Sequence, residues 1–152
     1  MLRGVRTGQR GTVSRARNLL VFSVGGRRLA TRAEDVVGIT RWKDSVPIVS
    51  RTPFVSAVVR QGQAVLPVFD LAGRLHLSVQ GSSPLCLTAT HPLGHMAICI
   101  DEEVPALQPY EPSGIQIYRG KDLPAEESYV IGFDEIPILS LSQLVPGSLQ
   151  TE

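Results

Sequence analysis

The chain has little of what catalysis, membrane insertion or cross-linking requires. Its 152 residues include two cysteines, three histidines and eight aromatic residues. No apolar run approaches the roughly 18 residues that span a bilayer, and no apolar leader precedes a small-residue cleavage site at the N-terminus. These absences predict a soluble, cytoplasmic protein without direct membrane insertion.

The two cysteines lie in apolar stretches. Cys86 stands in Pro-Leu-Cys-Leu-Thr and Cys99 in Ala-Ile-Cys-Ile-Asp, where a cysteine ordinarily serves as a small buried hydrophobe. Free thiols of this kind are typical of a reducing compartment. We therefore expect no disulfide framework.

Positive charge is concentrated at the N-terminus. The first 18 residues contain five arginines and no acid, and the remaining 10 basic and 14 acidic residues give the rest of the chain a net charge of −4. Residues 1–18 also carry several glycines and no apolar periodicity, which predicts a flexible arm. A mildly acidic body with few aromatics argues against a nucleic-acid-binding barrel, which needs a basic groove with stacking side chains.

What the chain does have is a series of short, β-rich segments. Hydrophobic residues make up 43% and charged residues 19% of the sequence, which suits a folded core. Short apolar runs recur at roughly 8–12-residue spacing, with few helical patterns, as in an all-β sandwich or barrel. The clearest runs are Leu19–Val24, Phe54–Val59, Ala64–Phe69, Leu85–Thr90, His95–Asp101 and Ser128–Phe133.

The pattern of these runs repeats along the chain. Leu66-Pro67-Val68-Phe69-Asp70-Leu71 is echoed by Ile136-Pro137-Ile138-Leu139-Ser140-Leu141. The echo predicts two similar, consecutive halves, the first ending near Gly73. Pro67 cannot donate to a ladder, so its strand is expected at an edge or with a bulge there.

The sequence offers no convincing active site. It has no Gly-x-Ser-x-Gly elbow, and nucleophilic catalysis needs an activated Ser or Cys beside an oriented base. Asp70 and Asp101 each follow an apolar strand, where capping and turn formation are the ordinary roles. We therefore predict no enzymatic activity, no catalytic residue and no cofactor.

One turn carries residue types that can bind zinc. His91, His95 and Cys99 supply two imidazoles and a thiol within nine residues, and zinc accepts such ligands. Pro92 and Gly94, however, place the histidines around a turn rather than on one helical face. A solvated turn beside a buried cysteine is the favoured interpretation, so no metal site is predicted.

The run from Phe54 to Leu71, with its glycine-bearing turn and a strand ending in Leu-Pro-Val-Phe-Asp-Leu, resembles the signature of CheW-like domains. The resemblance covers about residues 19 to 146 and leaves 1–18 as an arm and 147–152 as a tail. Further segments stand in the family's order: Leu20-Val21-Phe22, Gly25-Gly26, Glu34-Asp35-Val36-Val37, Met96 to Val104, and Ile136 to Leu141.

The resemblance implies two SH3-like five-stranded β-barrel subdomains packed side by side, with short helical turns. It also implies a non-enzymatic adaptor that couples methyl-accepting chemoreceptors to a CheA-type histidine kinase. In the family, receptor tips contact the groove between the barrels, and the kinase's regulatory domain docks on the first barrel. The alternative is a CheW-like binding module in a kinase pathway outside chemotaxis.

The partner-binding residues implied by the resemblance fall in two places. Val36, Val37 and Gly38 match one receptor-facing segment, with the two valines expected to be exposed anchors. The turn Arg60-Gln61-Gly62-Gln63 matches the other. It departs from the family's common Asn-Leu-Arg-Gly, because the arginine and the glycine are each displaced. Tyr118-Arg119-Gly120 best matches the family's glycine-bearing strand before the last hairpin.

Overall fold

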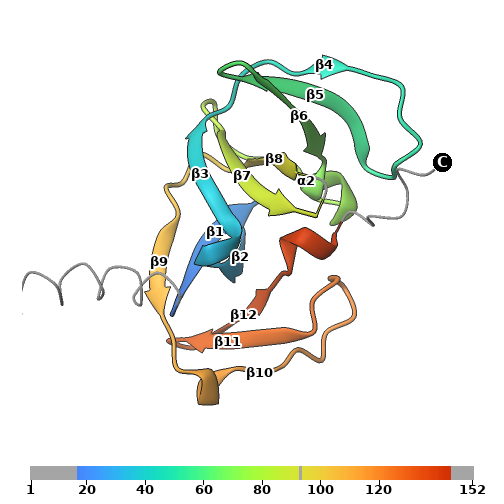
Figure 1. Ribbon diagram of the computed structural model, residues 1–152. Coiled ribbons are helices and arrows are strands. Elements are labelled where there is room, and N and C mark those ends of the chain that lie inside the picture. The colour runs from blue at the N-terminus through green and yellow to red at the C-terminus, as the bar shows by residue number, and fades with distance from the viewer. Residues whose placement is uncertain (1–16, 93, 145–152) are drawn as a thin grey trace, which may run out of the picture.

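A computed structural model describes residues 17–92 and 94–144 of the chain. The predicted arm, 1–18, and the predicted tail, 147–152, lie almost wholly outside the described residues. The described part forms two six-stranded sheets, here called sheet A and sheet B, and it confirms a mostly β fold with two subdomains (Figure 1). Each sheet has six strands rather than five, and in each one strand is only two residues long.

Sheet A has the order β10-β11-β12-β2-β1-β9, and sheet B has the order β3-β7-β8-β6-β5-β4. The strands of sheet A are β1 (Asn18–Val24), β2 (Arg27–Arg32), β9 (Ala106–Pro109), β10 (Gln116–Ile117), β11 (Glu127–Ile131) and β12 (Asp134–Ile138). The strands of sheet B are β3 (Val36–Arg41), β4 (Val46–Pro47), β5 (Val55–Gln61), β6 (Ala64–Phe69), β7 (Leu85–His91) and β8 (Gly94–Ile100). The helical turns are η1 (Ala33–Asp35), α2 (Leu71–Arg74), η2 (Pro112–Gly114) and η3 (Leu141–Gln143).

The two sheets are not consecutive halves of the chain, and that prediction was wrong. The chain places β1 and β2 in sheet A, builds all of sheet B from β3 to β8, and then returns to sheet A (Figure 1). β1 is flanked by β2 and by the distant β9, with which Leu20 pairs opposite Leu107. Periodicity identifies strands but not their partners, so the interleaving could not be seen in the sequence.

The sequence echo nevertheless corresponds to a real structural repeat. β6 meets β8 in parallel at Val68 and Ala97, and β12 meets β2 in parallel at Ile138 and Ala30. A proline immediately precedes Val68 and Ile138, and a short helix, α2 or η3, follows each strand. Read from one edge, both sheets have the same order of antiparallel and parallel pairings. Sheet B is therefore a circularly permuted copy of sheet A.

Pro67 does not mark an edge strand. β6 lies between β5 and β8, with Pro67 opposite Val58 on β5. The expected irregularity is present but falls in the neighbouring strand, where the register of β5 shifts between Val55 and Ala57. β6 pairs with β8 only at Val68, so a proline one residue away costs no ladder hydrogen bond on that side.

Three apolar cores hold the sheets. The central core lies between them and includes Phe22, Leu29, Phe69, Leu87, Ile98 and Leu139. Core A belongs to sheet A and contains Leu19, Val21, Ala30, Ile136 and Ile138; core B belongs to sheet B and contains Val59, Leu66, Val68, Cys86 and Ala97. One face of each sheet thus packs against the other sheet through the central core. The opposite face packs on core A in sheet A and on core B in sheet B.

Equivalent aromatic residues cover cores A and B. The Trp42 backbone N–H donates to the Pro84 carbonyl, and the Tyr110 N–H donates to the Arg17 carbonyl, both at 3.1 Å and at matching places in the two sheets. Trp42 packs against core B and Tyr110 against core A. Trp42 is therefore a loop residue packed over its own subdomain.

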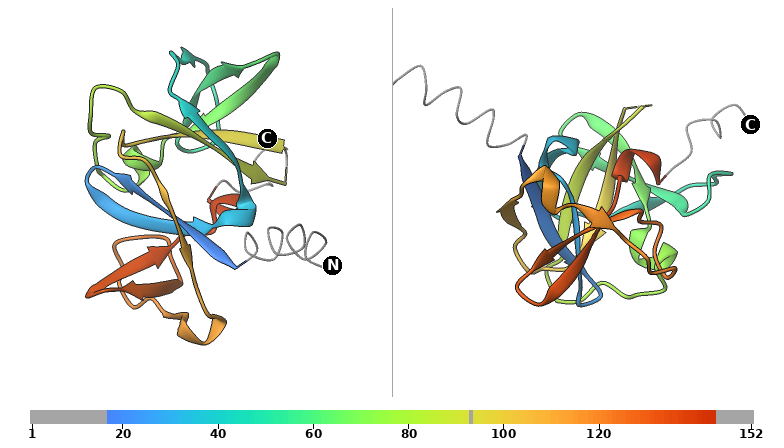
Figure 2. Two further views of the ribbon diagram at one scale, coloured as in Figure 1. Left: turned by 90° about the vertical axis from the view of Figure 1, so that its left-hand side faces the viewer. Right: turned by 90° about the horizontal axis from the view of Figure 1, so that it is seen from below.

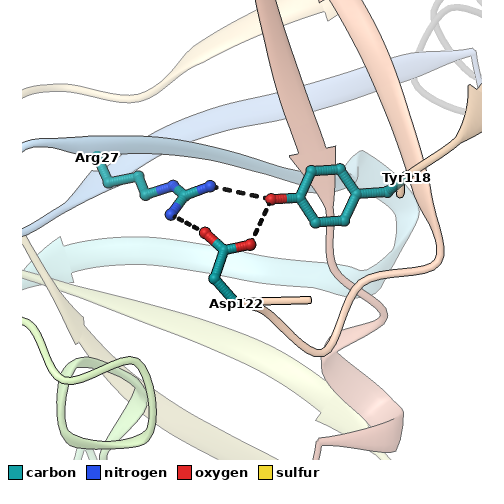
Figure 3. A network of polar contacts seen from close by, with 3 residues as sticks. All are labelled: Arg27, Tyr118 and Asp122. Carbon is teal, nitrogen blue, oxygen red and sulfur yellow. Dashed lines mark hydrogen bonds and ion pairs between the residues drawn. The ribbon is translucent and has the colours of Figure 1, made fainter. Parts of the chain in front are cut away.

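The long connection from Gln108 to Ser128 is ordered by contacts with the body. Leu123 is buried in the central core. Arg27 on β2 donates to the Tyr118 hydroxyl at 3.1 Å, and that hydroxyl donates to Asp122 at 2.7 Å (Figure 3). Hydrogen bonds from Tyr118 and Arg27 lower the pKa of the Asp122 carboxyl. The strand expected at 118–120 lies two residues earlier, at β10, and the Tyr118 N–H continues its pairing with β11 by donating to the Glu126 carbonyl at 2.9 Å.

Asp70 and Asp101 have the structural roles that the sequence predicted. Asp70 caps α2, its carboxylate accepting from the Gly73 N–H at 2.9 Å. Asp101 is 4% exposed and accepts backbone N–H bonds from Gly25, Gly26 and Gln80. Its carboxylate thus fastens the β1–β2 turn, where both glycines have positive φ, to the loop before β7.

His76 ends α2 in a left-handed conformation, with φ of 61°. The Leu77 N–H donates to the Ala72 carbonyl and the His76 N–H to the Gly73 carbonyl, the paired bonds of a Schellman motif. Because glycine adopts this conformation without a Cβ penalty, His76→Gly is expected to raise the free energy of unfolding by up to about 1 kcal/mol. Urea unfolding measures this gain, and a His76→Ala variant that is equally stabilised would contradict it.

Candidate partner-binding surface

The two predicted groups of binding residues meet at one place on sheet B. Arg60 and Gln61 end β5, while Val36, Val37 and Gly38 begin β3 at the far edge of the same sheet. The Gln61 side-chain amide donates to the Thr88 hydroxyl at 3.0 Å, and Thr88 on β7 is the direct partner of Gly38. Sheet B therefore curls far enough to bring the β5–β6 turn against β7 and β3.

Val36 is not an exposed anchor, and that expectation was wrong. It is 8% exposed and belongs to the central core, whereas Val37 is 47% exposed. Val36 pairs with Ala89, and both belong to the central core. The register skips Val37 before Gly38, so Val37 is the unpaired residue of a β-bulge. Val37 and the half-exposed Gly38 remain candidates for contact.

A small pocket separates β3 from the end of β5. Its lining residues are Thr40, Arg41, Lys43, Val59, Arg60, Gln61 and Cys86. Arg41, Lys43 and Arg60 are exposed at its mouth, and within the described residues no acidic side chain forms an ion pair with them. Three converging cations, each able to form charge-assisted hydrogen bonds, suit a carboxylate-bearing partner.

The displaced arginine has a structural explanation. Gln61, immediately before the turn glycine, points toward Thr88, and strand alternation sends the neighbouring Arg60 to the exposed side. Gly62 has φ of 62°, as a tight hairpin turn requires, and Gln63 beyond it is exposed. The arginine thus lies two residues before the turn glycine, whereas in the family pattern it lies immediately before it.

Sequence reasoning missed two residues of this surface, Arg41 and Lys43. It also missed Phe133, an exposed aromatic residue of sheet A. Arg41 and Lys43 flank Trp42, and the alternation of exposed and inward residues after β3 was the available signal. Phe133 at the β11–β12 turn occupies the place in sheet A that Gln63 occupies in sheet B, and it is fully exposed. Gly132, with φ of 66°, lies in that turn. Asp134 and Glu135 follow the turn as the first residues of β12. The two hairpins lie at opposite ends of the molecule (Figure 2).

The histidines face a different and largely apolar pocket. His91 and His95 line it with Val55, Phe69 and Met96. Within residues 17–92 and 94–144 no group of three or more His, Cys, Asp or Glu side chains is placed to hold a metal ion. Burial raises the pKa of the Cys99 thiol to about 11, and Cys86, Asp70 and Asp101 add to the rise.

One comparison identifies the family of this chain, and a second identifies a protein of similar fold. The sequence model of the CheW-like domain matches residues 18–108, so the chain is a member of the CheW-like domain family. Among solved structures, the scaffolding protein TtCheW from Thermoanaerobacter tengcongensis is similar in fold, with a TM-score of 0.69 and 16% sequence identity. The alignment covers 88% of this chain and 97% of that one.

No curated protein matches the chain. Among the helices of the described residues, none is long and apolar enough to cross a membrane.

Proposed function

We propose that this protein is a non-enzymatic signalling adaptor that couples methyl-accepting chemoreceptors to a CheA-type histidine kinase. Membership of the CheW-like family supports the class of function. The main structural support for a receptor contact is the hydrogen bond from Gln61 to Thr88. It brings the β5–β6 turn and the start of β3, the two segments predicted to bind a partner, into one surface. Bridging would act by raising the effective concentration of kinase near receptor.

The receptor-facing surface would combine apolar and cationic elements. Val37 and Ile39 are exposed on β3, and the end of the same strand, at Thr40 and Arg41, lines the pocket together with Arg60. Apolar side chains buried at the centre of an interface supply most of the affinity, and charges at the rim supply orientation and association rate. A receptor segment with an apolar face and a carboxylate would fit this arrangement.

A nucleic-acid-binding role receives no support. Trp42, the aromatic flanked by Arg41 and Lys43, packs on core B and is not free to stack on a base. The alternative is a role in a kinase pathway outside chemotaxis, and a pull-down from native lysate with this protein as bait distinguishes the two. Recovery from native lysate of a histidine kinase with no chemoreceptor would indicate it.

Val37→Asp is expected to lower the affinity for one of the two partners, receptor or kinase, strongly while leaving the fold intact. The side chain is nearly half exposed, so a charge there remains solvated in the free protein but would be desolvated in a complex. A loss of affinity on the order of 30-fold, about 2 kcal/mol, is expected. Titration calorimetry against purified receptor and kinase fragments measures it.

The matched control for this substitution is Val104→Asp, which places the same charge at an 80% exposed valine in the loop between β8 and β9. Circular dichroism melts should coincide for both variants and the wild type. The contact assignment is wrong if Val37→Asp binds both partners as tightly as Val104→Asp.

A further inference from the structure

The two cysteines of the chain face each other across sheet B. Cys86 on β7 and Cys99 on β8 are direct partners in the antiparallel register. Such partners place their side chains on the same face, with Cβ atoms about 4.5–5.5 Å apart. A disulfide needs Cα atoms within about 4.4–6.8 Å, a range that includes directly opposite antiparallel residues. The register thus places the two cysteines within about 1 Å of the roughly 3.5–4.5 Å Cβ separation that a disulfide needs.

The two thiols differ in access. Cys86 is 3% exposed within core B, while Cys99 is partly exposed. Burial raises the pKa of the Cys86 thiol, against opposing hydrogen bonds with Thr88, Ile98 and Thr40. An incoming reagent therefore reaches Cys99 first, and Cys86 lies behind it as the second thiol.

We propose that Cys86 and Cys99 form a modification site at which a small-molecule disulfide creates a reversible cross-strand disulfide. The Cys99 thiol loses its proton to solvent, and its sulfur attacks one sulfur of the reagent. The S–S bond of the reagent breaks, and one thiol is released. The Cys86 sulfur, likewise deprotonated, then attacks Cys99 Sγ and displaces the second thiol. Two cysteines are oxidised and one reagent disulfide is reduced to two thiols.

The modification would reach the candidate binding surface. Cys86 lines the pocket that Arg60 and Gln61 also line. Thr88, two residues further along β7, accepts the hydrogen bond from Gln61. Turning Cys86 Sγ toward Cys99 would change the lining of the pocket beside that hydrogen bond. Disulfides in reducing compartments, where they occur, are usually transient and regulatory.

The reaction should be slow at neutral pH. Only the thiolate attacks, and at Cys99 burial chiefly disfavours that form by raising the pKa, with smaller contributions from Cys86, Asp70 and Asp101. The thiolate fraction below the pKa rises about tenfold per pH unit. Disulfide formation should accelerate accordingly between pH 7 and pH 10.

The test uses the full chain, folded in native buffer, with oxidised glutathione as the probe. After acid quench and denaturation, free thiols are alkylated and the intact mass is measured. The expected product is a monomer lighter by about 2 Da, with no alkylation, and dithiothreitol restores both thiols. Two alkylated cysteines, a stable glutathione adduct on the wild type, or a covalent dimer would each overturn the proposal.

Two variants keep the test decisive. Cys86→Ser is expected to stop at a single glutathione adduct on Cys99, and Cys99→Ser to remain almost unmodified because Cys86 is buried. Far-UV circular dichroism and the fluorescence of the single tryptophan, which packs against the cluster containing Cys86, confirm the fold of each. A glutathione adduct on Cys86 at a rate equal to that on Cys99 would contradict the assigned order of attack.

Discussion

Replacing Asp101 with alanine is expected to lower the free energy of unfolding by about 3–5 kcal/mol. The carboxylate is buried and accepts N–H bonds of 2.9 Å from Gly25, 2.8 Å from Gly26 and 2.7 Å from Gln80. Alanine leaves these three donors without their acceptor and opens a small cavity. Urea-induced unfolding followed by circular dichroism measures the loss.

The chain provides a matched control for this substitution. Asp70 accepts one backbone N–H bond, at 2.9 Å, from an exposed position. Asp70→Ala should cost only about 1 kcal/mol, the usual value of a helix N-cap. If the two alanine variants unfold at the same urea concentration, Asp101 does not fasten the β1–β2 turn to the body.

Arg60→Glu is expected to weaken receptor binding by on the order of 10- to 100-fold, with kinase binding nearly unchanged. The new carboxylate lies at the mouth of the pocket that Arg41 and Lys43 also line. It would attract these cations itself and repel an acidic group on the partner. Binding of a purified receptor signalling fragment, measured by calorimetry at two salt concentrations, tests both the loss and its electrostatic origin.

Arg51→Glu is the control for charge reversal alone. Arg51 is an exposed residue outside the pocket, so its variant has the same net charge as Arg60→Glu. Receptor affinity should fall for Arg60→Glu and stay near the wild-type value for Arg51→Glu. Equal affinities for the two variants would remove Arg60 from the receptor contact.

The strands of this fold were predictable because their determinants are local. Alternating apolar residues and glycine-bearing turns located β1, β5, β6, β7 and β8 in the sequence. The assignment of strands to sheets was not predictable, because β1 pairs with β9 and β2 with β12 across most of the chain. The similar sequences around Pro67 and Pro137 correctly indicated a structural repeat. Because the two copies are circularly permuted, the sequence did not indicate which strands belong to each copy.

The candidate site could be predicted only in part for the same reason. Family resemblance pointed to the β5–β6 turn and to β3, and the curl of sheet B joins them through Gln61 and Thr88. Which of the adjacent Val36 and Val37 faces outward depends on a register shift in β3, which no local pattern reports. Arg41 and Lys43 contribute only because that curl brings the end of β3 beside Arg60.

The most direct test of the adaptor role is co-sedimentation of the kinase with receptor-bearing membranes. Receptor membranes and purified CheA-type kinase are mixed with the wild-type protein, with Arg60→Glu, or with neither. Bridging predicts that kinase enters the pellet with the wild-type protein, far less with Arg60→Glu, and hardly at all without it. Kinase that pellets equally in all three samples, or in none, would contradict the proposal that this protein couples receptor to kinase.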